Sequence, residues 1–317
     1  MAQDTCVEAI DLGGTDTKVG IVASDGRVLA DHVFATDHER GGTAWAEQTA
    51  RVIEDLSDRA QVCRDRIGGI GIGAPGPLSV REGILTNPMP NLPGWQGFPI
   101  CAVLSELRGK PSRLDNDANC AALAEHWIGA GKGIADLIVL TLGTGIGSGV
   151  IVEDRLLHGF SDNAGELGHT SINYRGPRCV CGNRGCIELY ASAPAVVRLY
   201  RRKVASSKTV RSRRPKLTAR DVFEAAVGGD ARARETFEQV GRFLGMAIAN
   251  MVHAFNPRMV VLAGGLAEAA EFMLEAIEQT VSEHTYPEHQ AGLEIRASDL
   301  GRRAGLLGAA RLMLDHC

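Results

Sequence analysis

The chain has 317 residues, with 34 Lys and Arg against 38 Asp and Glu, so its formal net charge is −4 at pH 7. Its length predicts two lobes with substantial cores, and 44% hydrophobic and 23% charged residues are typical of a globular protein. The acidic balance argues against a nucleic-acid surface. The N-terminus MAQDTCVEAIDLGG lacks a signal pattern and no apolar stretch is long enough to span a membrane, so we expect a cytoplasmic protein.

The first segment predicts short strands joined by tight turns. We expect strands over residues 5–11, 18–23 and 27–34, with turns at Gly13-Gly14 and Asp25-Gly26. Walker and Rossmann glycine loops open into a helix instead. Because Thr15-Asp16-Thr17 forms helices poorly, a hairpin is the better interpretation here.

Hydrophobic spacing and breaker residues predict the elements that follow. We expect helices over 44–63, 98–108, 118–128, 231–255 and 303–314, with further helices capped by Ser192 and Thr218. We expect strands over 67–73, 112–114, 137–142, 149–152, 156–157 and 259–263, the last followed by a Gly264-Gly265 loop and another helix. Residues 201–216 hold eight Lys and Arg, which favours a solvated helix end and loop over a nucleic-acid patch.

The order of the first elements recurs along the chain. The strands and glycine turn of residues 6–29 reappear in the same order about 130 positions later. This indicates a duplication that gives two lobes of similar topology. The alternative is that short strand–turn–strand units recur by chance.

Three glycine turns follow apolar strands, at Asp11–Thr15, Gly143–Gly147 and Ala263–Gly265. Glycines let backbone N–H groups approach anionic oxygens, so paired turns of this kind can hold a polyphosphate. Asp11 is a candidate ligand for Mg²⁺ through water, and Lys18 can offset phosphate charge. The alternative is that the hairpins need glycine for the turn itself.

A polar stretch, Leu114-Asp-Asn-Asp-Ala-Asn119, lies between a predicted strand and a predicted helix. Transfer of a phosphoryl group to an alcohol needs a carboxylate that accepts the hydroxyl proton. Asp117 can supply it, with Asn116 orienting a sugar. The alternative is a helix cap with an Asx turn.

Three of the eight cysteines crowd into eight positions and follow a histidine. His169, Cys179, Cys181 and Cys186 form a ligand set typical of a closed, structural zinc site, with Gly182 and Gly185 allowing tight turns. The alternative is a group of unliganded thiols. A zinc knot would hold the flanking Glu166 and Glu188 rigidly, so that they can accept hydrogen bonds from sugar hydroxyls. The other five cysteines are expected to be small buried hydrophobes.

The whole chain resembles the ROK family (repressors, open reading frames and kinases), which has the actin/hexokinase ATPase fold. The matching segments are DLGGTDTK, GIGAPGP, NPMPNLPGW, DNDANCAALAE, LTLGTGIGSG, GELGH, CVCGNRGCIE, VVLAGGL and AGLLGAARL. The resemblance implies an α/β, two-lobed, ribonuclease H-like fold with mixed sheets and a nucleotide and sugar cleft between the lobes. We expect a small lobe over 1–117 plus 302–317 and a large lobe over 118–301, with the zinc-binding segment at 169–186.

The resemblance also implies roles for single residues. Asp117 matches the catalytic base, and His169 would serve both zinc and sugar, one ring nitrogen each. The implied sugar site comprises Gly76, Asn91, Asn116, Asp117, Glu166, His169 and Glu188. The implied nucleotide site comprises phosphate positions Gly13, Gly14, Thr15, Thr144 and Gly145, and the adenosine-side Gly264 and Gly265. Many members have Lys after GGT where this chain has Asp16, and we expect Lys18, on the same side of the hairpin, to pair with it.

The resemblance implies an enzyme that phosphorylates a hexose with ATP, and glucose at O6 is the expected reaction. Kinases for N-acetylglucosamine, N-acetylmannosamine or fructose are the alternatives within the family. A sugar-responsive regulator would need an N-terminal helix-turn-helix, and the motif beginning at Asp11 leaves no room for one. An actin-like ATPase without a sugar substrate is a further alternative. The resemblance implies a homodimer or homotetramer with Mg²⁺ and structural Zn²⁺.

Overall fold

The computed structural model describes residues 5–86, 92–205 and 217–317, and these form two compact units. Unit 1 comprises Met1–Gly133, Leu156–Gly165 and Arg302–Cys317, and unit 2 comprises Ile134–Arg155 and Glu166–Gly301. The lobe boundaries predicted from the sequence differ from these units, because residues 118–133 and 156–165 belong to unit 1. The reason is that the helix after Asn116 packs against the C-terminal helix. Asn91 and most of the basic segment lie outside the described residues.

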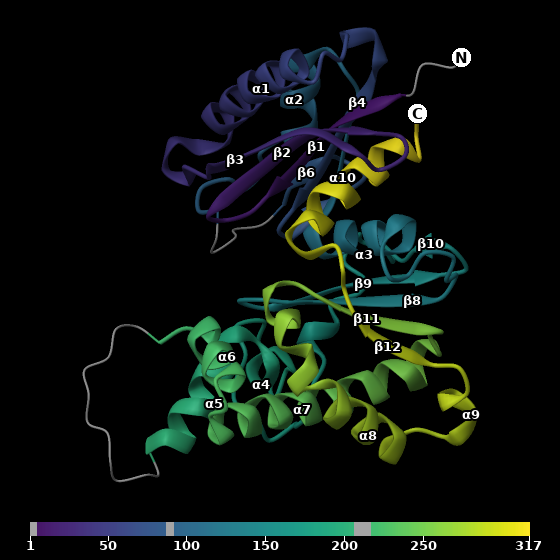
Figure 1. Cartoon of the computed structure of the whole chain (residues 1–317). Coiled ribbons are helices and arrows are strands. Elements are labelled where there is room, and N and C mark those ends of the chain that lie inside the picture. Colours follow the sequence, from purple (N-terminus) through teal and green to yellow (C-terminus); the bar gives the residue numbers. More distant parts are fainter. Residues whose placement is uncertain (1–4, 87–91, 206–216) are drawn as a thin grey trace. The chain divides into compact units, whose positions relative to one another are not determined.

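Unit 1 is built on a five-stranded sheet with strand order β3-β2-β1-β4-β7 (Figure 1). Its strands are β1 (Cys6–Leu12), β2 (Asp16–Ala23), β3 (Val28–Ala35), β4 (Ile67–Ala74) and β7 (Ser112–Asn116). A small hairpin, β5 (Leu78–Ser79) and β6 (Ile84–Leu85), follows β4. β1 and β4 are almost fully buried because helices cover both faces of the sheet, which explains their continuous apolar sequences.

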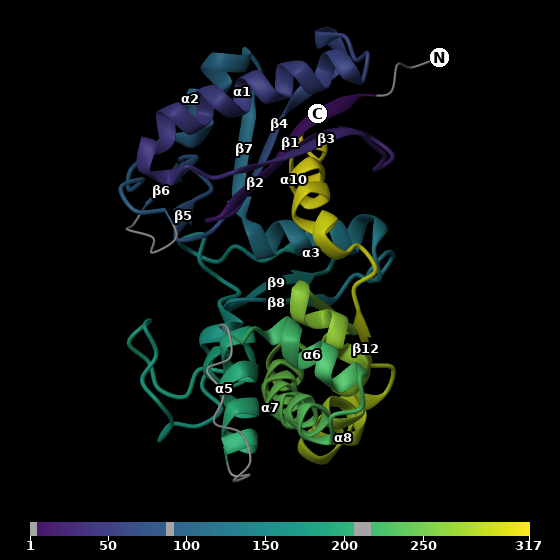
Figure 2. The ribbon, with the colours of Figure 1, turned by 60° about the vertical axis from the view of Figure 1, so that its left-hand side comes forward.

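The helices of unit 1 lie in two layers around this sheet. α1 (Gly41–Arg59) and α2 (Ile100–Arg108) cover one face, and α3 (Asp117–Ile128) and α10 (Ala304–Leu314) cover the other, as Figure 2 shows. A Cβ on Gly71 would lie 1.7 Å from the carbonyl oxygen of Ala309, and one on Gly308 would lie 1.6 Å from that of Cys120. Glycine at these two positions therefore lets α10 approach both β4 and α3.

We expect Gly308→Ala to lower the free energy of unfolding by about 3 kcal/mol, because the added methyl group meets backbone and separates α10 from α3. Gly265→Ala is the matched control, since a Cβ there has no neighbour within 4 Å. Urea unfolding of both variants measures the effect. Equal midpoints for the two variants would contradict the packing described.

Unit 2 is built on a second five-stranded sheet, with order β10-β9-β8-β11-β12. Its strands are β8 (Leu137–Leu142), β9 (Ile146–Val152), β10 (Arg155–Leu156), β11 (Met259–Ala263) and β12 (Glu294–Ala297). The helices are α4 (Glu188–Ala191), α5 (Ala193–Ala205), α6 (Ala219–Val227), α7 (Ala231–Phe255), α8 (Leu274–His284) and α9 (Pro287–Gln290). A 3-10 helix over Gly265–Phe272 contacts the sheet, and α7 packs against this 3-10 helix and against α8.

The two sheets have the same topology, which confirms the predicted repeat. In unit 1, β1 pairs antiparallel with β2 and parallel with β4. In unit 2, β8 pairs antiparallel with β9 and parallel with β11 in the same way. A further parallel strand, β7 or β12, completes each sheet. The carboxyl ends of the parallel strands therefore lie at one edge of each sheet, where α/β folds bind ligands.

Most predicted element boundaries agree with the structure, and the differences have local causes. Thr218 forms a capping box, and α7 ends at Asn256 in a left-handed conformation before Pro257. The helix expected directly after Gly264-Gly265 is instead a 3-10 helix followed by α8. The expectation that the five other cysteines are buried holds for Cys6 and Cys120, whereas Cys101 is partly buried against the core of unit 1, and Cys63 and the C-terminal Cys317 are exposed. No helix in the described part of the chain is long and apolar enough to cross a membrane.

Candidate active site

Asp11 stands at the carboxyl end of β1, opposite Lys18 in the β1–β2 hairpin. The Lys18 Nζ donates to Asp11 Oδ2 at 2.5 Å, so the expected pairing of Lys18 with the exposed Asp16 is wrong. The pairing differs because Asp11 is the direct cross-strand neighbour of Lys18. A Cβ on Gly305 would lie 2.6 Å from Asp11 Cγ, which places the first turn of α10 against the carboxylate. A helix N-terminus favours negative charge.

The turn after β1 holds the three predicted phosphate positions of unit 1. The Gly13 N–H donates to the carbonyl of Asp16 at 2.9 Å, and the carbonyl of Thr15 accepts from the Thr36 N–H at 2.7 Å. A Cβ on Gly13 would lie 2.7 Å from the Asp16 oxygen, so the turn needs glycine there. Gly14 is half-buried and Thr15 is exposed at the tip. These hydrogen bonds therefore hold the turn in a compact conformation next to Asp11.

Asn116 and Asp117 lie where β7 passes into α3. The Asn116 Oδ1 accepts from the Ala118 N–H at 2.8 Å, which makes Asn116 the N-cap and confirms the capping alternative for this residue. Asp117 is the first residue of α3 and is exposed. A Cβ on Gly76 would lie 3.2 Å from Asn116 Nδ2, so the turn after β4 reaches the Asn116 amide. Gly76, Asn116 and Asp117 are thus together at one sheet edge.

Unit 2 repeats this arrangement at the end of β8. The Gly143 N–H donates to the Gly145 carbonyl at 2.9 Å, which leaves Thr144 exposed at the tip of the turn. Glu188, the first residue of α4, accepts from the Ile146 N–H through Oε2 at 3.1 Å. A Cβ on Gly145 would lie 2.4 Å from that oxygen. The predicted sugar ligand Glu188 and the predicted phosphate turn of unit 2 are therefore in contact.

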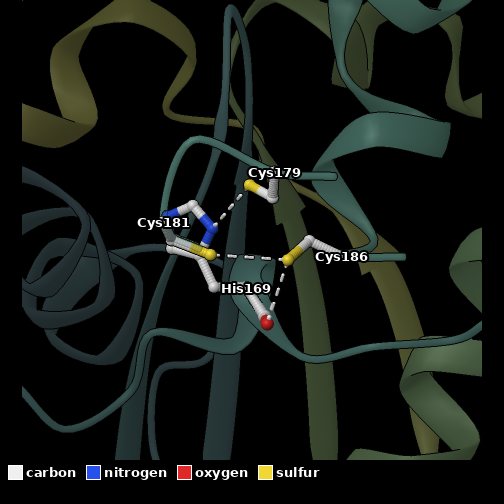
Figure 3. A group of neighbouring side chains, drawn as sticks. All are labelled: His169, Cys179, Cys181 and Cys186. Atoms are coloured by element: carbon white, nitrogen blue, oxygen red, sulfur yellow. Dashed lines mark hydrogen bonds between the residues drawn. The ribbon is translucent and has the colours of Figure 1, made fainter. Parts of the chain in front are cut away.

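The predicted metal ligands converge into one group, drawn in Figure 3. One ligand atom each from His169, Cys179, Cys181 and Cys186 lies within 4.8 Å of all the others. The His169 Nδ1 is 3.7 Å from Cys179 Sγ, and Cys181 Sγ is 3.6 Å from Cys186 Sγ. Tetrahedral zinc with Zn–S distances near 2.3 Å separates two sulfur ligands by about 3.8 Å. The donor types and their separations fit such an ion.

The backbone around this group is tied down by short-range contacts. Asn183 Nδ2 donates to the His169 carbonyl at 3.0 Å, and residues 171 and 186 form a β-bridge. Gly185 has φ +70°, as the predicted tight turn requires. Burial raises the pKa of the Cys186 thiol to about 12, so a bound cation is what would make it a thiolate at neutral pH.

Glu166 begins the same segment, immediately before the 3-10 helix over Leu167–His169. Its carbonyl accepts from the His169 N–H at 3.1 Å, and the Glu166 side chain is exposed. Glu166 thus precedes the histidine by three residues in the chain, and Glu188 follows Cys186 by two.

A hollow of about 290 Å³ opens beside the predicted adenosine positions of unit 2. It is lined by Thr144 and Gly265 and also by Arg220, Phe223 and Leu266. Gly264 has φ +83° and its Cβ would lie 2.6 Å from the Leu142 carbonyl oxygen, so glycine is needed there to join β11 to this wall. Thr144 also lines a neighbouring hollow of about 830 Å³ along α5.

We compared the sequence and the fold with those of known proteins. The sequence model of the ROK family matches residues 7–316. The chain belongs to the ROK family.

Its similarity to ROK kinases extends over nearly the full length. The glucokinase of Thermotoga maritima is 37% identical, over 97% of this chain and 96% of its own. The solved ROK hexokinase of Thermus thermophilus is 38% identical with a TM-score of 0.80, covering 97% of both chains. A ROK glucokinase from Streptomyces griseus, solved with glucose and AMPPNP, is 30% identical with a TM-score of 0.79, covering 97% of this chain and 98% of its own. The fold is therefore the actin/hexokinase-like fold of ROK sugar kinases.

Regulators are also among the ROK relatives. The xylose repressor of Bacillus subtilis is 32% identical over 78% of this chain, and the match covers 61% of the repressor. The kinases thus match this chain over more of their own length than this regulator does.

Sequence reasoning on this ROK protein missed several residues that the structure brings to the sites. Arg220 and Phe223 line the hollow beside Gly265, although α6 shows only an ordinary amphipathic pattern. Asp115 and His158 are hydrogen-bonded behind Asn116, 43 positions apart in the chain. No local spacing signals either contact, because both depend on how distant elements pack.

Proposed function

We propose that this chain phosphorylates a hexose with ATP, and that its substrate is glucose at O6. The observation that carries the proposal is the placement of Asn116 and Asp117. They stand at the carboxyl edge of the β1–β4–β7 sheet, the edge that also holds Asp11 and the glycine turn. An exposed carboxylate on the first turn of a helix stays ionised at neutral pH, as a proton acceptor must.

In the proposed reaction the sugar O6 attacks the γ-phosphorus of ATP, the O6 proton passes to Asp117, and ADP leaves with the electrons of the broken P–O bond. Asn116 orients the sugar through its Nδ2, because its Oδ1 accepts from Ala118 N–H. Asp11 is the proposed carboxylate for hydrated Mg²⁺, and Lys18 moderates its charge. Mg²⁺ supplies charge neutralisation on the phosphates when it is bound.

The nucleotide positions are proposed in both repeats of the fold. Gly13, Gly14 and Thr15 in unit 1, and Thr144 and Gly145 in unit 2, would offer backbone N–H groups to phosphate oxygens. Gly264 and Gly265 would line the adenosine side, where Phe223 supplies an aromatic ring to the hollow.

We further propose a structural Zn²⁺ held by His169 Nδ1 and the thiolates of Cys179, Cys181 and Cys186. The four ligand atoms, none more than 4.8 Å from another, support a closed tetrahedral site without an open position. His169 Nε2 then remains for a sugar hydroxyl, and zinc fixes the orientation of the ring. Glu166 and Glu188 are the proposed sugar-binding carboxylates on either side, and Asn91 stays a predicted sugar ligand. A homodimer or homotetramer stays the expected assembly.

A coupled ADP-release assay over a hexose panel tests the proposal, using protein of measured zinc content. We expect turnover that depends on added sugar and is greatest with glucose. Greater turnover with N-acetylglucosamine, N-acetylmannosamine or fructose would keep the kinase and change its substrate. ATP turnover that no sugar stimulates would instead indicate an ATPase and would overturn the proposal.

A further inference from the structure

Asp115 is a fully buried carboxylate directly behind the proposed catalytic pair. Its Oδ1 accepts from the Asn116 N–H at 2.7 Å and from Asn119 Nδ2 at 2.8 Å, so it ties the end of β7 to the first turn of α3. Its Oδ2 is 2.6 Å from His158 Nε2. The side chain of Asp115 is 0% exposed and that of His158 is 32% exposed. The proposed mechanism assigns no role to either residue.

His158 lies on a segment that leaves unit 2 and returns to it. Residues 156–165 belong to unit 1, and the next residue, Glu166, begins the segment of unit 2 that carries the proposed sugar and metal ligands. The Ala164 N–H donates to the His158 carbonyl at 3.0 Å, and Asp162 Oδ2 accepts from the Arg81 N–H at 3.3 Å. The His158–Asp115 contact thus joins this segment to β7.

The surroundings of His158 carry charges of both signs. The imidazole borders a hollow of about 340 Å³ in unit 1. The titratable and charged groups around it are Arg81 and Glu82 after β5, Cys101 on α2, Arg113 and Asp115 on β7, Asp162 on its own segment, and His316 after α10. The hydrogen bond to Asp115 raises the pKa of His158, with burial opposing the effect.

The negative charges of three carboxylates act on one buried thiol of α3. The pKa of Cys120, which is on α3, is raised first by burial and then by the negative charges of Asp115, Asp11 and Asp117. Lys18 partners Asp11, and His158 partners Asp115. Without a cation at Asp115, its charge would act on Asp117, because like charges favour the protonated form of a carboxyl. A proton acceptor must not be protonated in this way.

We propose that His158 is a positioning residue for phosphoryl transfer: as an imidazolium it neutralises Asp115, which holds the first turn of α3, and thereby keeps Asp117 ionised. The proposal rests on the kinase function of Asp117. It assigns His158 no contact with substrate. Burying a carboxylate without a charged partner is costly, and His158 supplies the cationic partner of Asp115.

The acid limb of the pH–rate profile tests the proposal. In His158→Ala we expect the acid limb of kcat/KM to move up by about one pH unit, because the unpaired Asp115 charge raises the pKa of Asp117. Adding Asp115→Asn removes that charge and retains an Oδ1 acceptor for Asn116 and Asn119, so the limb should return to its wild-type position. His158→Gln, which keeps a hydrogen-bond donor, serves if the alanine variant does not fold. His32→Gln, at an exposed histidine of β3, should leave the profile unchanged.

A second measurement needs no turnover. The NMR titration of His158 in wild-type protein should give a pKa above the ordinary value of about 6.5, and Asp115→Asn should lower it. Because the pKa is raised in the folded state, the stability from this pair is fully present below about pH 6.5 and is lost as pH rises through the raised pKa. The difference in unfolding free energy between wild type and His158→Gln should therefore become smaller as the pH rises through the raised pKa of His158.

These results separate the inference from the proposed function. An inactive wild-type protein with the expected His158 titration would remove the kinase and leave the ion pair. An active enzyme whose acid limb is the same in His158→Ala, or whose shifted limb is not restored by Asp115→Asn, would overturn the positioning role. A His158 pKa that Asp115→Asn does not change would overturn it as well.

Discussion

Asp117→Asn is expected to lower kcat about 10³-fold while the dissociation constant for glucose changes by less than about threefold. The amide keeps the size and one acceptor oxygen of the carboxylate at the start of α3, so the fold and the Asn116 cap are retained. It cannot take the proton of the attacking hydroxyl, and general base catalysis contributes about 10²–10⁴ in rate. Steady-state ADP release gives kcat, and calorimetric titration with glucose gives the dissociation constant.

The control for this variant is Asp55→Asn, which removes one negative charge from an exposed position on α1. It should leave both constants unchanged. If Asp117→Asn kept more than a tenth of wild-type kcat, another group would be the proton acceptor. If it lost glucose binding as completely as turnover, Asp117 would be a binding residue only.

Loss of zinc is the second large effect that we expect. Structural zinc in small peptides is bound with about 10–16 kcal/mol, and that free energy becomes folding free energy of the segment that holds it. Cys186→Ser should therefore abolish stoichiometric zinc, lower the melting temperature and reduce kcat/KM for glucose by more than about 100-fold. The reason for the last effect is that Glu188 follows the cluster directly and contacts the Gly145 turn through Ile146.

Metal analysis, thermal unfolding and ADP release measure these three quantities on the same preparation. Cys63→Ser is the matched control, because Cys63 is exposed and outside the cluster. Chelation of the wild-type protein should mimic Cys186→Ser, and added Zn²⁺ should restore activity. Full activity in protein that contains no zinc would contradict the assigned role of the metal.

The sequence predicted those features that depend on neighbouring residues. Glycine turns between short apolar runs predicted the β1–β2 hairpin. The recurrence of this pattern predicted a repeat, which the strand orders of the two sheets confirm. Thr218 and the Asn256-Pro257 stop are local signals and mark helix ends as expected. The histidine and cysteine spacing predicted a group whose side chains do converge, because a short segment with two turn glycines closes on itself.

The features that sequence reasoning did not reach are contacts between distant elements. Lys18 pairs with its cross-strand neighbour Asp11, and not with Asp16, because strand register decides which carboxylate it meets. The placement of α3 in unit 1 follows from Gly308, whose missing side chain lets α10 approach α3. The bond between Asp115 and His158 also depends on distant elements. It joins β7 to residues 156–165, which lie in unit 1 although the residues before and after them in the chain belong to unit 2.

The transfer of the terminal phosphate of ATP is the central claim, and following the label from γ-³²P-ATP in the presence of glucose tests it most directly. We predict label in glucose 6-phosphate in a one-to-one ratio with ADP formed, and little in inorganic phosphate. Label that appears in inorganic phosphate at the same rate with and without sugar, across the hexose panel, would contradict the claim.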